Sequence, residues 1–214
     1  ISNASVHNKG GNQIYNNTIE DSIGNISLEN GQANIVSNNI ILPTGEDTDS
    51  NDGGISFTPY GHTITGNYIA GLRTTSSQRG GLTTNSERAS DSGNAVLTPS
   101  PITVANNTIV NSRQPINFSA NDCIEGTFTI HFESNLIANG EDPTLDIDGD
   151  YGFEGRLANG ESRDAIIDGC GLSAESTHNN DHYYAKDLSK NGTFAFQSGS
   201  GNIGANDTEG LADI

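Results

Sequence analysis

The segment from residue 14 to residue 42, IYNNTIEDSIGNISLENGQANIVSNNIIL, contains nearly the same sequence twice. Asn16-Asn17-Thr18-Ile19 returns as Asn38-Asn39-Ile40-Ile41, and apolar residues alternate with polar ones around each copy. Alternation of this kind is typical of β-strands, whose successive side chains point to opposite faces. We therefore interpret the segment as two copies of a strand–turn–strand unit.

The second Asn of this step recurs along the chain at intervals of 22, 28, 40 and 28 residues. The shortest interval lies in the range of solenoid repeats, and the longer ones fit the same unit with insertions. We place these insertions at residues 43–53, 71–97 and 112–126. The recurring residues are Asn17, Asn39, Asn67, Asn107 and Asn135.

Stacked units place equivalent residues above one another, so the sequence predicts an all-β parallel β-helix with apolar rows inside. Asn tolerates a left-handed turn and can hydrogen-bond its neighbours in the stack. The residues three positions before the repeated Asn are expected to form one inward row. They are Ile14, Val36, Ile64 and Val104. We expect a single domain over 1–214, with regular coils to about residue 140 and an irregular, insertion-rich part over 141–214.

The net charge of −18 argues against nucleic acid and anionic membranes as partners, because both attract a basic surface. It also weighs against unaided binding of a polyanionic sugar. No window holds the 18 apolar residues of a membrane span. Cys123 and Cys170 allow one disulfide or two buried thiols. Since the chain opens inside strand-like sequence, we expect it to be part of a larger protein.

The repeat region resembles polysaccharide lyase family 6, the alginate lyase and chondroitinase B group. The resemblance rests on NQIYNNTIEDSIGNISLENGQANIVSNNIIL, DGGISFTPYGHTITGNYIAGL and ITVANNTIVN, and it covers about residues 5–118. It implies a right-handed, pectate-lyase-like β-helix in a secreted or periplasmic bacterial protein. In that family a uronic acid polymer is cut by β-elimination, with a Lys as base, an Arg as acid and usually a calcium ion.

The sequence departs from this family at the catalytic positions. Glu29 and Asn30 in LENG stand where the family has Arg and His, and Ser56 in GGIS replaces a further Arg. Asn8 aligns with the Lys, and Lys9 lies one position along, which on a strand is the opposite face. A Glu in the Arg position would repel the dianion that forms when a proton is removed next to a carboxylate.

Three hypotheses follow for the function. The first is a module that supports or guides an acidic polysaccharide such as alginate beside a companion catalytic domain. The second is an active alginate lyase with a rearranged set drawn from Lys9, His62 and Arg73. The third is a non-enzymatic glycan-binding or adhesive β-helix.

Two acidic loops are candidate calcium sites, because alternating acids beside Gly can supply oxygen ligands. They contain Asp47, Asp49 and Asn51, and Asp146, Asp148 and Asp150. The alternative in each case is a solvated loop, since neither matches an EF-hand loop.

Three other groups contain side chains that are common in functional sites. HNNDHYY, residues 178–184, could transfer protons or hold zinc, but we expect a surface loop there. His62 either lines a cleft or is a turn residue that holds the backbone. The third group consists of Arg73, Arg79 and Arg88. These arginines could contact an acidic sugar or lie in a solvated loop.

Overall fold

Every regular element in the described part of the chain is a β-strand. The computed structural model describes residues 10–20, 26–28, 31–42, 53–58, 60–72, 80–84, 100–112, 115–117, 127–139, 141–142, 147–148, 171–172, 175, 177–185 and 203–205. No helix that could cross a membrane occurs within these ranges. The predicted all-β class is confirmed.

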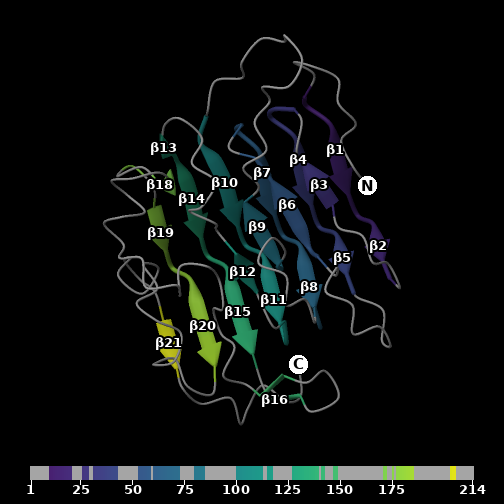
Figure 1. Cartoon of the computed structure of the whole chain (residues 1–214), viewed down its shortest axis with the longest axis vertical. Helices are drawn as coiled ribbons and strands as arrows, with labels where there is room; N and C mark the ends of the chain where they lie inside the picture. The colour runs from purple at the N-terminus through teal and green to yellow at the C-terminus, as the bar shows by residue number, and fades with distance from the viewer. Residues whose placement is uncertain are drawn as a thin grey trace.

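Three parallel sheets hold most of the strands (Figure 1). Sheet A contains β3 (Ile26–Leu28), β6 (Ile55–Phe57), β9 (Leu82–Thr84) and β12 (Ile116–Asn117). Sheet B contains β1 (Gln13–Tyr15), β4 (Ile35–Ser37), β7 (Thr63–Thr65), β10 (Ile102–Ala105), β14 (Ile130–Glu133) and β19 (Thr177–Asn179). Sheet C contains β2 (Thr18–Ile19), β5 (Ile40–Ile41), β8 (Tyr68–Ala70), β11 (Thr108–Val110), β15 (Leu136–Asn139), β20 (His182–Ala185) and β21 (Ile203–Ala205).

Two short strand pairs lie outside these sheets. β13 (Thr127–Phe128) pairs in parallel with β18 (Gly171–Leu172). β16 (Glu141–Asp142) pairs antiparallel with β17 (Ile147–Asp148).

The chain visits the three sheets in a fixed order. β3, β4 and β5 lie in sheets A, B and C, and β6, β7 and β8 repeat this order one strand further along. The register keeps equivalent residues opposite each other, as in the pairs Ile14↔Val36, Val36↔Ile64 and Val104↔Ile64. The predicted inward row is therefore confirmed, and it continues to Phe132.

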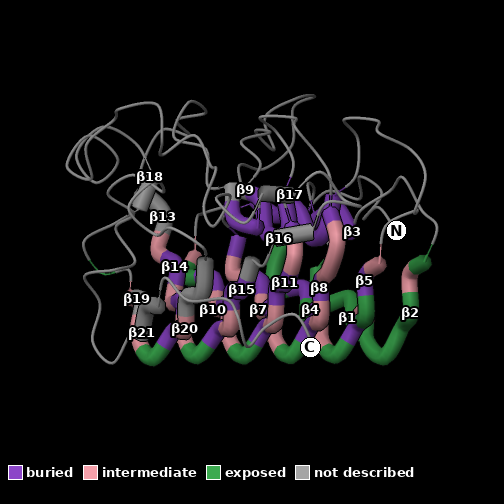
Figure 2. Tube along the Cα trace, turned by 90° about the horizontal axis from the view of Figure 1, so that it is seen from below, coloured by how far each residue is buried: buried purple, intermediate pink, exposed green. Residues whose placement is uncertain are grey.

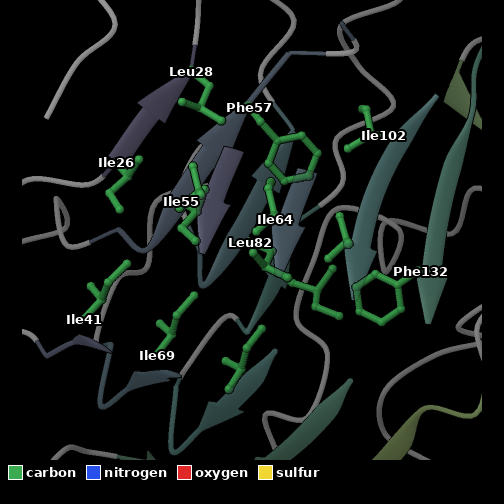
Figure 3. Close-up of a cluster of buried hydrophobic side chains, with 14 of the residues drawn as sticks. Ile26, Leu28, Ile41, Ile55, Phe57, Ile64, Ile69, Leu82, Ile102 and Phe132 are labelled. Carbon is green, nitrogen blue, oxygen red and sulfur yellow. The ribbon is translucent and has the colours of Figure 1, made fainter. Parts of the chain in front are cut away.

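The core lies between the sheets and consists of aliphatic and aromatic rows. Ile64, Val104 and Phe132 of sheet B are fully buried, as are Ile26 and Phe57 of sheet A. Figure 3 shows Ile26, Phe57, Ile64 and Phe132 among the buried side chains of this core. Figure 2 shows buried segments inside and exposed residues at the turns between sheets B and C. Apolar residues at every second position of short strands are sufficient to explain this arrangement.

The two residues of the Asn-Asn step have different structural roles. The first residue makes the turn between sheets B and C with a positive φ, which is 54° at Asn16, 53° at Asn38 and 56° at Asn106. Gly66 and Ser134 take the same place with φ of 66° and 57°. Asn and Gly adopt this left-handed conformation more readily than other residues, so the turn explains the first position.

The second Asn builds a hydrogen-bonded ladder through the protein. Its Oδ1 accepts hydrogen bonds from the backbone N–H and the Nδ2 of the preceding ladder residue, at 3.0 Å each between Asn67 and Asn39. Its Nδ2 also donates to a carbonyl of the preceding strand in sheet B, as Asn107 does to Ile64 at 3.0 Å. Asn39, Asn67, Asn107 and Asn135 are at most 1% exposed. The expected stacking of these residues is confirmed.

The regular repeat extends past the boundary expected near residue 140. β19, β20 and β21 join sheets B and C in parallel register, and Asp181 continues the Asn ladder. The prediction of a surface loop over 178–184 was therefore wrong, because Asp181 is fully buried between two strands. The alternative zinc site needed two histidines on one helix face, and this segment is extended. Because Asp181 takes the position of the ladder Asn, the sequence 178–184 does not match the Asn repeat.

Candidate functional site

Ser56, where the resemblance described above implies an Arg, lies on the outer face of sheet A. Ser56 is the middle residue of β6, between Ile55 and Phe57, which face the core. It pairs with Ser27 of β3 and with Thr83 of β9, so the three form one outward row. We call this the sheet A row.

The sheet A row is enclosed. Ser27, Ser56 and Thr83 are 6%, 4% and 2% exposed, and the Ser56 hydroxyl donates to Ser27 Oγ at 3.2 Å. Thr83 Oγ1 is buried and has no hydrogen-bond partner among the described residues. Next to the row, the Thr58 hydroxyl donates to the Leu28 carbonyl at 2.9 Å and ties β6 to β3.

This row offers hydroxyl groups and no charge. Among the described residues of sheet A there is no Lys, Arg, His, Asp or Glu. A hydroxyl without an adjacent base is a weak nucleophile and a weak proton acceptor. The described part of this face can therefore hydrogen-bond a group that reaches it, but it cannot neutralise a carboxylate.

His62 lies in a second ladder, just before β7. Its Nδ1 accepts a hydrogen bond from the Asn34 backbone N–H at 3.2 Å, and Asn34 Oδ1 accepts from Asn12 at 3.1 Å. The imidazole is fully buried, and its Nε2 has no hydrogen-bond partner in the part of the chain that the structure describes. Burial lowers the pKa of His62 from 6.5 to about 4, so the ring is neutral. These contacts match the turn histidine that holds the backbone, and a buried ring cannot reach a polymer in solvent.

Most other residues selected from the sequence lie outside the described ranges. These are Asn8, Lys9, Glu29, Asn30, Asp47, Asp49, Asn51, Arg73, Arg79, Arg88, Cys123, Asp146, Asp150 and Cys170. The backbone of Asp148 belongs to β17. Within the described ranges, no group of three or more His, Cys, Asp or Glu side chains could hold a metal ion.

A polar cluster on the outer face of sheet B was not found from the sequence. His131 and Glu133 of β14 meet Thr177 of β19, at 3.0 Å from His131 Nδ1 to Thr177 Oγ1 and 3.0 Å from Thr177 Oγ1 to Glu133 Oε1. The alternation in IHFE places His131 and Glu133 on one face of a strand. Thr177 is 46 residues from His131, and no sequence pattern pairs them.

An all-β chain whose strands fall repeatedly into three parallel sheets has the organisation of the polysaccharide lyases of β-helix type. The family comparison agrees: the model described as Chondroitinase B matches residues 4–141, well over half of the chain, and the chain belongs to this family. Comparisons with curated proteins and with solved structures gave no match.

Proposed function

We propose that this chain is a right-handed parallel β-helix module of a secreted or periplasmic bacterial polyuronate lyase. In this proposal it supports or guides an acidic polysaccharide such as alginate, and a companion catalytic domain performs the β-elimination. Membership of the Chondroitinase B family supports the lyase context and an acidic substrate.

The observation that carries the supporting role is the environment of Ser56. The resemblance implies an Arg at this position, and this chain has an enclosed hydroxyl bonded to Ser27. Removal of a proton next to a carboxylate requires positive charge close to the dianion that forms. Ser56 supplies none, and Glu29 brings negative charge to the other Arg position.

The net charge of −18 acts in the same direction. It repels a polyuronate over a range of about 8 Å at physiological salt. We therefore propose that binding of alginate by this chain alone is weak and depends on calcium, held by the acidic loops near residues 47–51 and 146–150.

A lyase assay of the isolated chain tests the proposal. Alginate and chondroitin-type polymers are offered separately, and the absorbance of the unsaturated uronate product is followed with a catalytically active family member as the reference. We expect no product above the protein-free control. Turnover comparable to the reference would contradict the proposal and show that this chain is itself an active lyase.

Substitution of Ser56 tests the enclosed environment separately. Ser56→Arg should destabilise the fold by several kcal/mol, because an unpaired guanidinium would be buried. Ser56→Ala is the matched control and should cost about 1 kcal/mol. If Ser56→Arg folds with the stability of the wild type and binds alginate, this face is open to substrate. Calorimetry with and without a chelator tests the calcium requirement.

A further inference from the structure

The cluster on sheet B fixes the tautomer of His131. The Thr177 hydroxyl has one proton, which it donates to Glu133 Oε1 at 3.0 Å. The contact of 3.0 Å between Thr177 Oγ1 and His131 Nδ1 must then use a proton on Nδ1. In its neutral form the imidazole then presents the lone pair of Nε2.

Two acceptors remain unused in this cluster. His131 Nε2 and Glu133 Oε2 have no hydrogen-bond partner among the described residues, and both side chains are half-buried. They project from alternate positions of one strand, on the face opposite Phe132, which is in the core. The hydrogen bonds to Thr177 hold both side chains in place, so little conformational freedom would be lost when a ligand binds.

The described residues around the cluster disfavour anions and suit hydroxyl groups. In-register pairs place Thr103 beside His131 and Ala105 beside Glu133. Strand neighbours of this kind are about 4.8 Å apart. Across the described residues of sheet B there is no Lys or Arg to attract a carboxylate, while Glu133 repels one.

From this geometry we infer that the outer face of sheet B binds a neutral sugar through a vicinal diol. Two neighbouring sugar hydroxyls donate to His131 Nε2 and Glu133 Oε2, and Thr103 lies beside them for further hydrogen bonds. The face is separate from the sheet A row and takes a different class of ligand from an acidic polymer. The chain would thus contact a neutral segment of a polysaccharide, or a second polysaccharide, independently of lyase chemistry.

A binding titration with defined oligosaccharides tests this inference. The probe is 1,4-linked xylohexaose, whose internal residues carry free neighbouring hydroxyls. The comparison sugars are 1,3-linked glucohexaose, whose internal residues lack adjacent free hydroxyls on the ring, and a mannuronate hexamer. Imidazole nitrogen resonances of His131 are followed by NMR, since Nε2 shifts when it accepts a hydrogen bond. We expect a Kd on the order of 1 mM for xylohexaose and binding at least about ten-fold weaker for the other two.

Variants separate this cluster from the rest of the face. Glu133→Ala should weaken xylohexaose binding about ten-fold, while Glu133→Gln, which keeps an acceptor oxygen, should lose less. Thr63→Ala, on the same face two strands away, is the control and should bind as the wild type does. Absence of xylohexaose binding at 10 mM, equal affinity for all three sugars, or wild-type affinity of Glu133→Ala would each overturn the inference.

Discussion

Asn135 donates two hydrogen bonds to one carboxylate oxygen of Asp181, from its backbone N–H at 2.7 Å and from its Nδ2 at 3.0 Å. At every earlier step of the ladder, the acceptor is the side-chain carbonyl of an Asn. Asp181 therefore supplies the acceptor oxygen that an Asn supplies at the earlier steps, but it has a second carboxylate oxygen where Asn has its NH2 donor.

Asp181→Asn is expected to stabilise the protein by about 1 kcal/mol at neutral pH. Asn135 Nδ2 donates to the Val104 carbonyl at 3.0 Å, and the register of sheet B makes Phe132 the equivalent of Val104 one strand further on. The amide of an Asn at position 181 can donate to the Phe132 carbonyl, whereas an ionised Asp has no proton to donate. The free energy of unfolding in urea measures the difference. A less stable variant would show that the carboxylate has a favourable role of its own.

Removal of a ladder residue should cost far more in the middle than at the exposed end. Asn107 accepts from Asn67 and donates to Ile64, Ala105 and Asn135 inside the protein, so Asn107→Ala should cost about 3 kcal/mol or more. Asn17 is exposed and its side chain acts only as a donor to other described residues, so Asn17→Ala should cost about 1 kcal/mol. Urea unfolding of both variants gives the comparison. Equal costs would indicate that the ladder bonds do not depend on burial.

The stability should decrease with acid through His62. The pKa of its buried ring is about 4 in the folded protein, against 6.5 ordinarily, so the unfolded chain takes up the proton first. The contribution of His62 is then fully present above pH 6.5 and is lost as the pH falls towards 4, to a limit of about 3 kcal/mol.

His62→Asn is the matched variant, because Asn occupies the earlier positions of the same ladder and does not titrate there. Urea unfolding is measured for both proteins at several values between pH 7 and pH 4, and the difference between them cancels the effect of other groups. If the free energy of unfolding changed with pH equally in both proteins, the lowered pKa of His62 would be contradicted.

The turn at Ser134 contains a residue that seldom adopts its conformation. Its φ is 57°, where the equivalent positions have Asn or Gly. Ser134→Gly should stabilise the fold by about 0.5–1 kcal/mol because it relieves this strain. Gly66→Ala is the reverse test and should destabilise, since φ is 66° and the added Cβ would lie 2.4 Å from Asn38 Oδ1. Thermal unfolding measures both. A loss of stability in Ser134→Gly would mean that the Ser side chain contributes more than the strain costs.

The spacing of Asn and β-branched residues was enough to predict the parallel strands and the inward row from Ile14 to Val104. It failed at Asp181, because an acid supplies the same acceptor as Asn but does not match the pattern. It also gave no indication of the Asn12–Asn34–His62 ladder, in which an imidazole nitrogen replaces an amide oxygen.

The candidate site was less accessible to sequence reasoning than the fold. The resemblance to the family drew attention to Ser56, but the enclosure of its hydroxyl depends on packing between segments distant in the chain. The His131–Thr177–Glu133 cluster requires the register of β14 against β19, and in the sequence the Asn repeat fades between these strands, after about residue 138.

Successive ladder residues are separated by 22, 28, 40, 28 and 46 positions, yet each pair is hydrogen-bonded in the same way. Strand pairing therefore does not depend on the number of residues between two ladder residues. Loops of different length and composition can be exchanged there by evolution or by grafting, while the ladder keeps the strands aligned. This makes the connections between sheets the place where new recognition surfaces can arise on an unchanged scaffold.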